Sequence, residues 1–126
     1  MKRIPESELQ LMLLIWKADG PVCRTDLEAE LKEQQWAAPT IMTMLTRLVA
    51  KGYLAVEKQG KVNYYTPLIT EEAYASYEGK TLMGRFFDNS LKKLAVCMTK
   101  ERNFTREELE ELRAFLDEQN RKQSDI

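Results

Sequence analysis

The chain has 126 residues, 44% of them hydrophobic, which suits one compact domain or two small ones. Nineteen basic and 20 acidic residues give a net charge of −1, so bulk charge does not indicate a nucleic-acid partner and local charge must decide. The longest apolar run, LMLLIW, is too short to cross a bilayer, and the N-terminal MKRIPESE lacks the apolar stretch of a signal peptide. These features predict a soluble, cytoplasmic protein.

Three helices are predicted in the first part of the chain. The first spans Ser7–Gly20, with Ser7 as its cap, because apolar residues recur there at helical spacing and Gly-Pro ends the run. A short second helix is expected over Thr25–Glu33. A third is expected from Pro39 to Lys51, since proline suits a first turn and the following glycine suits a helix end.

A β-hairpin and three further helices are predicted next. Tyr53–Lys58 and Val62–Thr66 are rich in β-branched and aromatic residues and flank a glycine turn. Thr70 is expected to cap a long helix, which Asp88–Ser90 interrupts before another helix begins. Thr105 opens a capping-box motif ahead of the last helix.

This order of elements predicts a mainly α fold. Three helices followed by a two-stranded wing form a winged helix-turn-helix, which we assign to residues 1–69. Residues 70–126 are expected to form a helical domain of three helices.

The predicted third helix is divided into two halves. At about 100° per residue, one arc is apolar and the other is polar without any carboxylate. The apolar arc contains Ile41, Met42, Met44, Leu45, Leu48 and Val49, and the polar arc contains Thr40, Thr43, Thr46, Arg47, Ala50 and Lys51. An ordinary solvated helix face would show a similar division. The absence of acids, which phosphates would repel, favours nucleic-acid recognition.

Positive charge continues beyond this helix. Between residues 36 and 65 four basic residues oppose Glu57 alone, and two of them lie at the tip of the expected hairpin, where a wing meets DNA backbone. We expect base edges to be read by Thr40, Met42 and Thr43, with Met42 contacting thymine methyl groups. We expect the DNA backbone to be held mainly by Arg47, Lys51, Lys58 and Lys61.

Three aromatic residues are expected near this surface. Trp36 either closes the core or stacks against the DNA backbone, and the core is favoured because large aromatic side chains usually bury. Tyr64 and Tyr65 alternate across a strand, so one should face the core and the other the wing surface.

The second part of the chain is rich in apolar residues for its size. A small intramolecular core is one explanation, but three short helices alone would be marginally stable, so a subunit interface is favoured. The residues expected to mediate dimerisation are Leu82, Phe86, Phe87, Leu91, Leu94, Leu109, Leu112, Phe115 and Leu116.

The residue types that catalysis and metal binding require are scarce. The chain has no histidine, and Cys23 and Cys97 lie far apart and form no C-x-x-C pair. It also lacks a glycine-rich phosphate loop and a G-x-S-x-G motif. We therefore predict no enzyme activity, no catalytic residues, no metal site and no cofactor.

The chain resembles the penicillinase-repressor family (BlaI/MecI/CopY) of bacterial winged-helix transcription regulators. The resemblance rests on SELQLMLLIWKADGPV, TIMTMLTRLVAKGYL, YYTPLITEEAY, KTLMGRFFDNSLKKL and REELEELRAFL. It implies a homodimeric repressor on a palindromic double-stranded DNA operator, control of β-lactam resistance or a related stress response, and a membrane sensor-protease as inducing partner. No small-molecule substrate is implied. A protein-binding winged helix, or a repressor of unrelated genes with a different inducer, is the alternative.

The chain departs from the family pattern in three places. Pro39 and Met42 stand where family members often have lysine and arginine, so the family operator is not carried over. The family's cleaved Asn-Phe bond aligns with Cys97-Met98, and Asn103-Phe104 lies outside that position, so cleavage is not carried over either. The tail DEQNRKQSDI lacks the cysteine cluster of the copper-sensing branch, and copper sensing is not expected.

Overall fold

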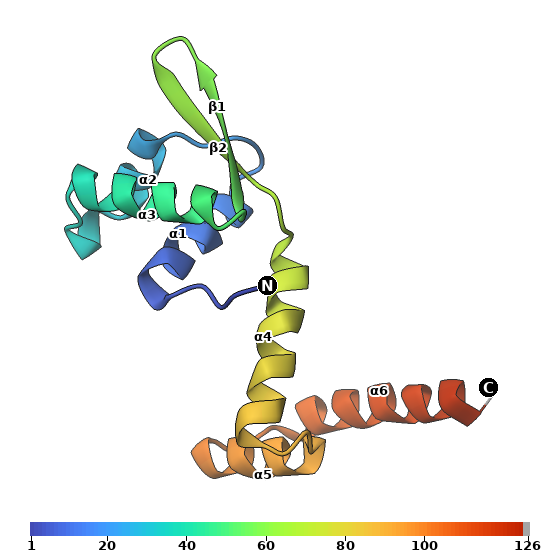
Figure 1. Cartoon of the computed structure of the whole chain (residues 1–126). Coiled ribbons are helices and arrows are strands. Elements are labelled where there is room, and N and C mark those ends of the chain that lie inside the picture. The colour runs from blue at the N-terminus through green and yellow to red at the C-terminus, as the bar shows by residue number, and fades with distance from the viewer. Residues whose placement is uncertain (125–126) are drawn as a thin grey trace. The chain divides into compact units, whose positions relative to one another are not determined.

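The computed structural model describes residues 1–124, so Asp125 and Ile126, the end of the expected helical domain, lie outside it. Within these residues three helices and a β-hairpin precede three further helices (Figure 1). The predicted mainly α, winged helix-turn-helix fold is therefore confirmed. The chain divides into two compact units, Met1–Gly79 and Lys80–Ile126.

Three helices build the core of the first unit. These helices are α1 (Glu6–Lys17), α2 (Arg24–Glu30) and α3 (Ala38–Ala50). Their most deeply buried side chains are Leu11, Met12 and Ile15 of α1, Leu27 of α2, and Ile41, Leu45 and Leu48 of α3. Burial of one such side chain stabilises the fold by roughly 1.5–3 kcal/mol, so α3 is held firmly by one face. Trp36 also packs against this core, as favoured from the sequence.

A β-hairpin follows α3. Strands β1 (Leu54–Gln59) and β2 (Val62–Pro67) are antiparallel, and their register leaves only Gly60 and Lys61 in the turn. Gly60 has a φ of +65°, which a residue without Cβ adopts at little steric cost. The hairpin is therefore tight, and its tip carries a lysine.

The hairpin is tied to the helices through Tyr65. This residue is buried whereas Tyr64 is half-buried, which confirms the predicted alternation. Val22, in the connection between α1 and α2, exchanges two backbone hydrogen bonds with Tyr65, at 3.1 and 2.7 Å. Val22 thus forms an isolated β-bridge beside β2, which the sequence did not predict.

The first unit continues beyond the wing into α4 (Glu71–Phe86). Thr70 caps α4 as predicted, since its hydroxyl accepts a hydrogen bond from the N–H of Ala73 at 3.1 Å. Tyr74, one turn further on, is only 3% exposed and belongs to the core. Because α4 contributes this aromatic side chain, the compact unit extends to Gly79, inside the helix.

The first helix starts earlier than predicted. α1 begins at Glu6 with Pro5 as its N-cap residue, so Ser7 lies in the first turn and makes no capping hydrogen bond. The N–H of Leu9 bonds to the carbonyl of Pro5 at 2.8 Å, which closes this turn. The buried side chain of Ile4 draws the preceding segment against the core.

The second helix is displaced towards the N-terminus at both ends relative to the prediction. Cys23 is its N-cap residue, and the backbone N–H of Cys23 bonds to the carboxylate of Asp26 at 3.1 Å. After Glu30 the chain tightens into a 3-10 turn over Lys32–Gln34. Cys23 and Asp26 form a capping box, in which each residue accepts a hydrogen bond from the backbone N–H of the other. This cap explains why the helix begins one residue before Thr25.

The second unit contains the end of α4, α5 (Leu91–Glu101) and α6 (Arg106–Ser124). Asp88 and Asn89 end α4 with φ angles of +50° and +60°, which these residue types tolerate better than most. Ser90 then caps α5 by accepting a hydrogen bond from the N–H of Lys93 at 3.1 Å. The predicted interruption between these two helices is confirmed.

The capping box predicted for α6 is only half formed. Thr105 accepts a hydrogen bond from the N–H of Glu108 at 3.1 Å, but the Glu108 carboxylate turns to Arg102 at 2.9 Å. The Arg102 guanidinium also lies 4.2 Å from the centre of the Phe104 ring. Hydrogen bonds from Arg102 lower the pKa of the Glu108 carboxyl below its ordinary value.

Candidate nucleic-acid interface

α3 buries one face and exposes the other. Thr40, Thr43 and Arg47 are exposed, as predicted. The segment APTIMTMLTRLVA that forms the helix contains no carboxylate. Among residues 1–124 no acidic side chain lies within ion-pair distance of Arg47. Its guanidinium is therefore available for a phosphate or for the edge of a guanine.

The hydroxyl of Thr43 has a defined orientation. It donates to the backbone carbonyl of Pro39 at 2.9 Å, and Thr46 donates to the carbonyl of Met42 in the same way. Because the proton of Thr43 is used within the helix, the side chain presents only lone pairs and a methyl group outward. It can accept a hydrogen bond from cytosine or adenine, or contact a thymine methyl, but it cannot donate to guanine.

Met42 belongs to the apolar arc of α3, as predicted, and its contact with base edges stays a prediction. It is half-buried and packs against the core, because its position is at the edge of the apolar arc. It lines a pocket of about 300 Å³ that joins α3, the start of α2 and the hairpin. The other lining residues are Cys23, Arg24, Thr25, Lys61, Val62, Asn63 and Tyr65. Met42 therefore shapes this pocket and is less available to base edges than the neighbouring threonines.

The wing presents two lysines to solvent. Lys58 is exposed on β1, opposite Asn63 of β2, and Lys61 is exposed in the turn. Within the described residues neither lysine forms an ion pair. The hairpin extends away from the helices, so this charge stands at a projecting tip (Figure 1).

Lys51 lies in a different environment from the one predicted. Its ammonium group is 2.9 Å from the carboxylate of Glu8 on α1. The Glu8 side chain is 5% exposed, whereas that of Lys51 is 32% exposed, so the carboxylate is shielded from water and the lysine is only partly so. The ion pair offsets part of the positive charge of Lys51, but the residue as a whole is exposed, so its contact with the DNA backbone stays a prediction.

Two polar residues near the wing were missed by sequence reasoning. Arg24 and Asn63 line the same pocket as Lys61, although they belong to α2 and β2. The Arg24 guanidinium is 3.5 Å from Glu28, which offsets part of its charge. Only the fold brings these residues together, because nearly 40 positions of sequence separate them.

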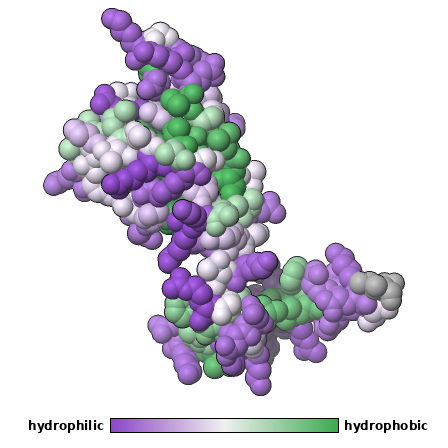
Figure 2. All heavy atoms as spheres, in the orientation of Figure 1, coloured by the Kyte–Doolittle hydropathy of each residue, from purple (hydrophilic) through white to green (hydrophobic). Residues whose placement is uncertain are grey.

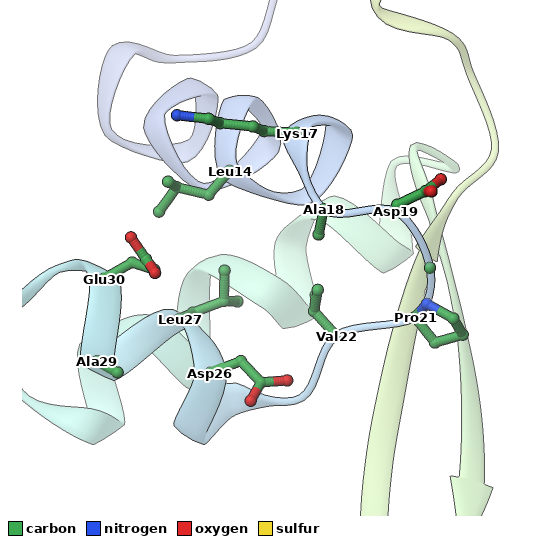
Figure 3. Close-up of a pocket in the computed structure, with 11 residues that line it drawn as sticks. Leu14, Lys17, Ala18, Asp19, Pro21, Val22, Asp26, Leu27, Ala29 and Glu30 are labelled. Atoms are coloured by element: carbon green, nitrogen blue, oxygen red, sulfur yellow. The ribbon is translucent and has the colours of Figure 1, made fainter.

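A larger pocket lies between α1, the following turn and α2 (Figure 3). Its volume is about 610 Å³, and Leu14, Val22 and Leu27 form apolar parts of its wall. The charged residues around it are Lys17, Asp19, Asp26 and Glu30. Because carboxylates outnumber the lysine and would repel phosphate, this pocket is poorly suited to binding nucleic acid.

Comparison with known proteins identifies the family. The model of the family described as penicillinase repressor matches residues 4–118, which include both the exposed face of α3 and the wing. The chain belongs to the penicillinase repressor family.

Relatives in this family are similar over nearly their whole length. The penicillinase repressor of Bacillus licheniformis is 34% identical over 126 residues, covering 97% of this chain and 98% of the relative. The methicillin resistance regulatory protein MecI of Staphylococcus aureus is 25% identical, covering 90% of this chain and 92% of the relative. The solved DNA-binding domain of the repressor BlaI is 41% identical with a TM-score of 0.52, covering 59% of this chain and 94% of that domain.

The second unit of this penicillinase repressor family member exposes its apolar residues. Within residues 80–124 no side chain is buried, which excludes the small intramolecular core in the single chain. Figure 2 shows hydrophobic atoms at the surface among hydrophilic ones over α5 and α6. Of the expected dimerisation residues, Phe87 and Leu94 are half-buried, and the exposed ones are Leu82, Phe86, Leu91, Leu109, Leu112, Phe115 and Leu116.

Two further family-related segments can be placed in the structure. Cys97-Met98, at the aligned cleavage position, lies inside α5, and Asn103-Phe104 lies in the connection between α5 and α6.

No helix within residues 1–124 combines the length and apolar character needed to span a membrane.

Proposed function

We propose that this protein is a transcription repressor that binds double-stranded DNA sequence-specifically as a homodimer. The observation that supports this best is the exposed, carboxylate-free face of α3, flanked by the unpaired lysines Lys58 and Lys61 of the wing. On this proposal α3 enters the major groove and the hairpin rests on the adjacent backbone. The repressors among its relatives, and the similarity to the DNA-binding domain of BlaI, support the same function.

Two copies joined through their second units would bind a palindromic operator. The exposed apolar residues of α5 and α6 need a partner surface, and a second copy supplies one that is identical and apolar. Half-sites one helical turn apart would be separated by roughly 34–36 Å. A homodimer then presents its two α3 helices to the same side of the duplex.

The relatives also indicate the genes under control. We propose an operon for β-lactam resistance or a related stress response, because the relatives are repressors of penicillinase and regulators of methicillin resistance. On this proposal the protein acts in the cytoplasm and catalyses no reaction. Its inducer would be a membrane sensor-protease or a signal that works without cleavage, since Cys97-Met98 replaces the cleavable bond.

Selection of bound duplexes from random DNA, followed by fluorescence anisotropy, tests this function. We expect a palindromic consensus and an affinity that falls steeply as salt concentration rises. Binding that ignores sequence, or that barely responds to salt, would instead support a protein-binding winged helix.

Arg47→Ala should weaken binding to the selected operator by about 1–3 kcal/mol if the guanidinium pairs with a guanine. Arg47→Lys is the matched control, because lysine keeps the positive charge but cannot form the bidentate hydrogen bonds of a guanidinium. Anisotropy titrations should show a loss for both variants if Arg47 reads a base. Recovery with lysine would assign Arg47 to the phosphate backbone, and unchanged affinity in both would remove it from the interface.

Lys58→Ala and Lys61→Ala should weaken binding to all DNA sequences alike. Removing one lysine–phosphate interaction is expected to reduce the slope of log affinity against log salt by about one unit. The slope is measured with the operator and with an unrelated duplex, and Lys17→Ala, on exposed α1 surface, serves as control. A changed sequence preference would show that the hairpin reads bases.

A further inference from the structure

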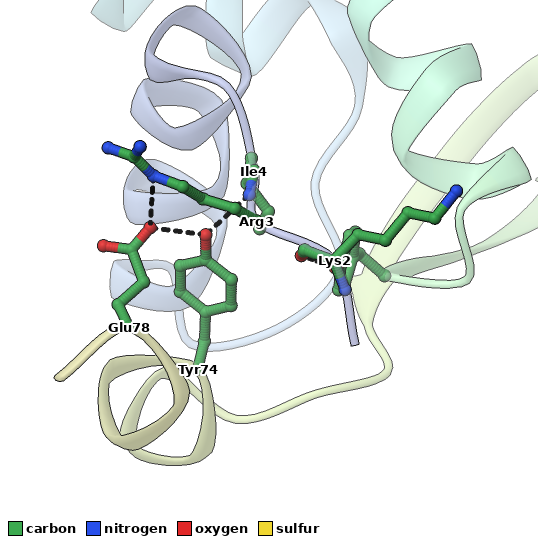
Figure 4. Close-up of polar contacts among 6 residues, drawn as sticks. Lys2, Arg3, Ile4, Tyr74 and Glu78 are labelled. Carbon is green, nitrogen blue, oxygen red and sulfur yellow. Dashed lines mark hydrogen bonds and ion pairs between the residues drawn. The ribbon is translucent and has the colours of Figure 1, made fainter. Parts of the chain in front are cut away.

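The N-terminal segment is bonded to the first turns of α4 (Figure 4). The backbone N–H of Ile4 donates to the hydroxyl of Tyr74 at 2.6 Å, and this hydroxyl donates to the carboxylate of Glu78 at 2.6 Å. The guanidinium of Arg3 lies 3.6 Å from the same carboxylate oxygen. Ile4 is 1% exposed, so the segment is anchored by its side chain as well.

The ring of Tyr74 contacts three other aromatic rings. Its centre lies 5.9 Å from that of Trp16 on α1, 6.2 Å from that of Tyr53 and 6.0 Å from that of Tyr77. Such pairs contribute stability beyond simple burial. The indole N–H of Trp16 donates to the carbonyl of Ile69 at 2.8 Å, which also fixes the chain just before α4.

A second tyrosine holds the same segment from the other side. Tyr53, between α3 and β1, is buried, and its hydroxyl accepts a hydrogen bond from the N–H of Lys2 at 2.9 Å and donates to the carbonyl of Lys2. The N-terminal segment is therefore bonded both to α4 and to Tyr53, which lies shortly after the end of α3. Through it, the start of α4 is connected to the helix that carries the candidate base-reading residues.

The Tyr74 hydroxyl does not titrate at physiological pH. Burial, followed by the hydrogen bond to Glu78, raises the pKa of the Tyr74 hydroxyl from 10.0 to about 12. A raised pKa means that the stability from the protonated hydroxyl is complete below pH 10 and is lost as the pH approaches 12. At neutral pH the hydroxyl keeps its proton and continues to donate to Glu78.

We propose that Tyr74 is a positioning residue for operator binding, which fixes the direction in which α4 leaves the winged helix. This inference rests on the proposed function. In a dimer, the spacing of two reading helices is defined only if each winged helix is held firmly at the start of α4. The gain in affinity from binding both half-sites depends on that geometry. The second winged helix binds intramolecularly only when the spacing of the half-sites matches the spacing of the two winged helices.

The test compares Tyr74→Phe with Tyr77→Phe in the full chain. Tyr74→Phe keeps the aromatic contacts and removes the bonds to Ile4 and Glu78, whereas Tyr77→Phe removes a hydroxyl of the same helix that forms no hydrogen bond within the described residues. Both variants are titrated against the selected operator, a duplex with a single half-site, and operators with one or two base pairs inserted between the half-sites.

For Tyr74→Phe we expect about a tenfold loss of affinity for the complete operator and little change on the single half-site. We also expect weaker discrimination against the lengthened operators, which a purely structural role would not produce. Tyr77→Phe should behave as the unmodified protein. An equal loss on complete and single sites, or no loss on either, would overturn the proposal.

Glu78→Gln gives a second measurement if Tyr74→Phe does not fold, as judged by circular dichroism. Glutamine keeps an acceptor for the Tyr74 hydroxyl but removes the attraction to Arg3, so a smaller loss confined to the complete operator is expected. An unchanged spacing preference in this folded variant would count against the proposal. Failure of the unmodified protein to select any operator would instead refute the proposed function itself.

Discussion

Leu112→Asp is expected to convert the protein to a monomer and to weaken binding to the complete operator by about 100-fold or more. Leu112 is 50% exposed in the single chain, so aspartate should not disturb its fold. It lies on the same side of α6 as Leu109 and Leu116. At the interface between two copies the new carboxylate would be buried without a partner, which costs several kcal/mol.

Analytical ultracentrifugation and anisotropy measure the two parts of this prediction. Ala114→Asp is the matched control, because it adds the same charge to exposed surface on the opposite side of α6. It should leave the dimer and the operator affinity intact. If Leu112→Asp remained dimeric, the interface would have to exclude this face of α6, and the residues of α5 would be tested next.

Lys51→Met is expected to lower the free energy of unfolding by about 1–3 kcal/mol and to leave the salt dependence of operator binding nearly unchanged. The destabilisation follows because the Glu8 carboxylate would remain buried without its partner. The salt dependence should persist because the lysine charge is already compensated by Glu8. This pair of outcomes separates an internal role from the phosphate contact that the sequence predicted.

Urea unfolding of Lys51→Met, compared with Lys58→Met, measures the first outcome. Lys58 is an exposed wing residue without an ion pair, so its substitution should change stability by less than about 0.5 kcal/mol. Adding Glu8→Gln to Lys51→Met should restore part of the missing stability by removing the buried charge. A stable Lys51→Met variant with a reduced salt slope would return Lys51 to the set of DNA contacts.

The sequence predicted those parts of the interface that depend on local periodicity. The two faces of α3 follow from helical spacing alone, and Gly60 indicated the hairpin turn. Met42 is half-buried because it stands at the edge of the apolar arc, where a small rotation of the helix decides between burial and exposure. The ion pair of Lys51 was not predicted because its partner, Glu8, is 43 positions away and no local pattern reveals such a pair.

The domain boundary shows a similar limit. Pro67 and the cap at Thr70 mark the start of α4 correctly, yet the compact unit includes Tyr74 because its ring packs on Trp16. The extent of the first compact unit therefore depends on contacts between residues far apart in the sequence. The apolar residues of α5 and α6 were recognised, but their composition alone allowed either an internal core or an interface, and only their exposure excludes the first.

On the proposal that α3 lies in the major groove, the inward-turned hydroxyl of Thr43 also limits which operator sequences can be bound. In natural operators, the base that faces this side chain should be adenine, cytosine or thymine, but not guanine. Promoters that acquire guanine there would escape control without any change in the regulator.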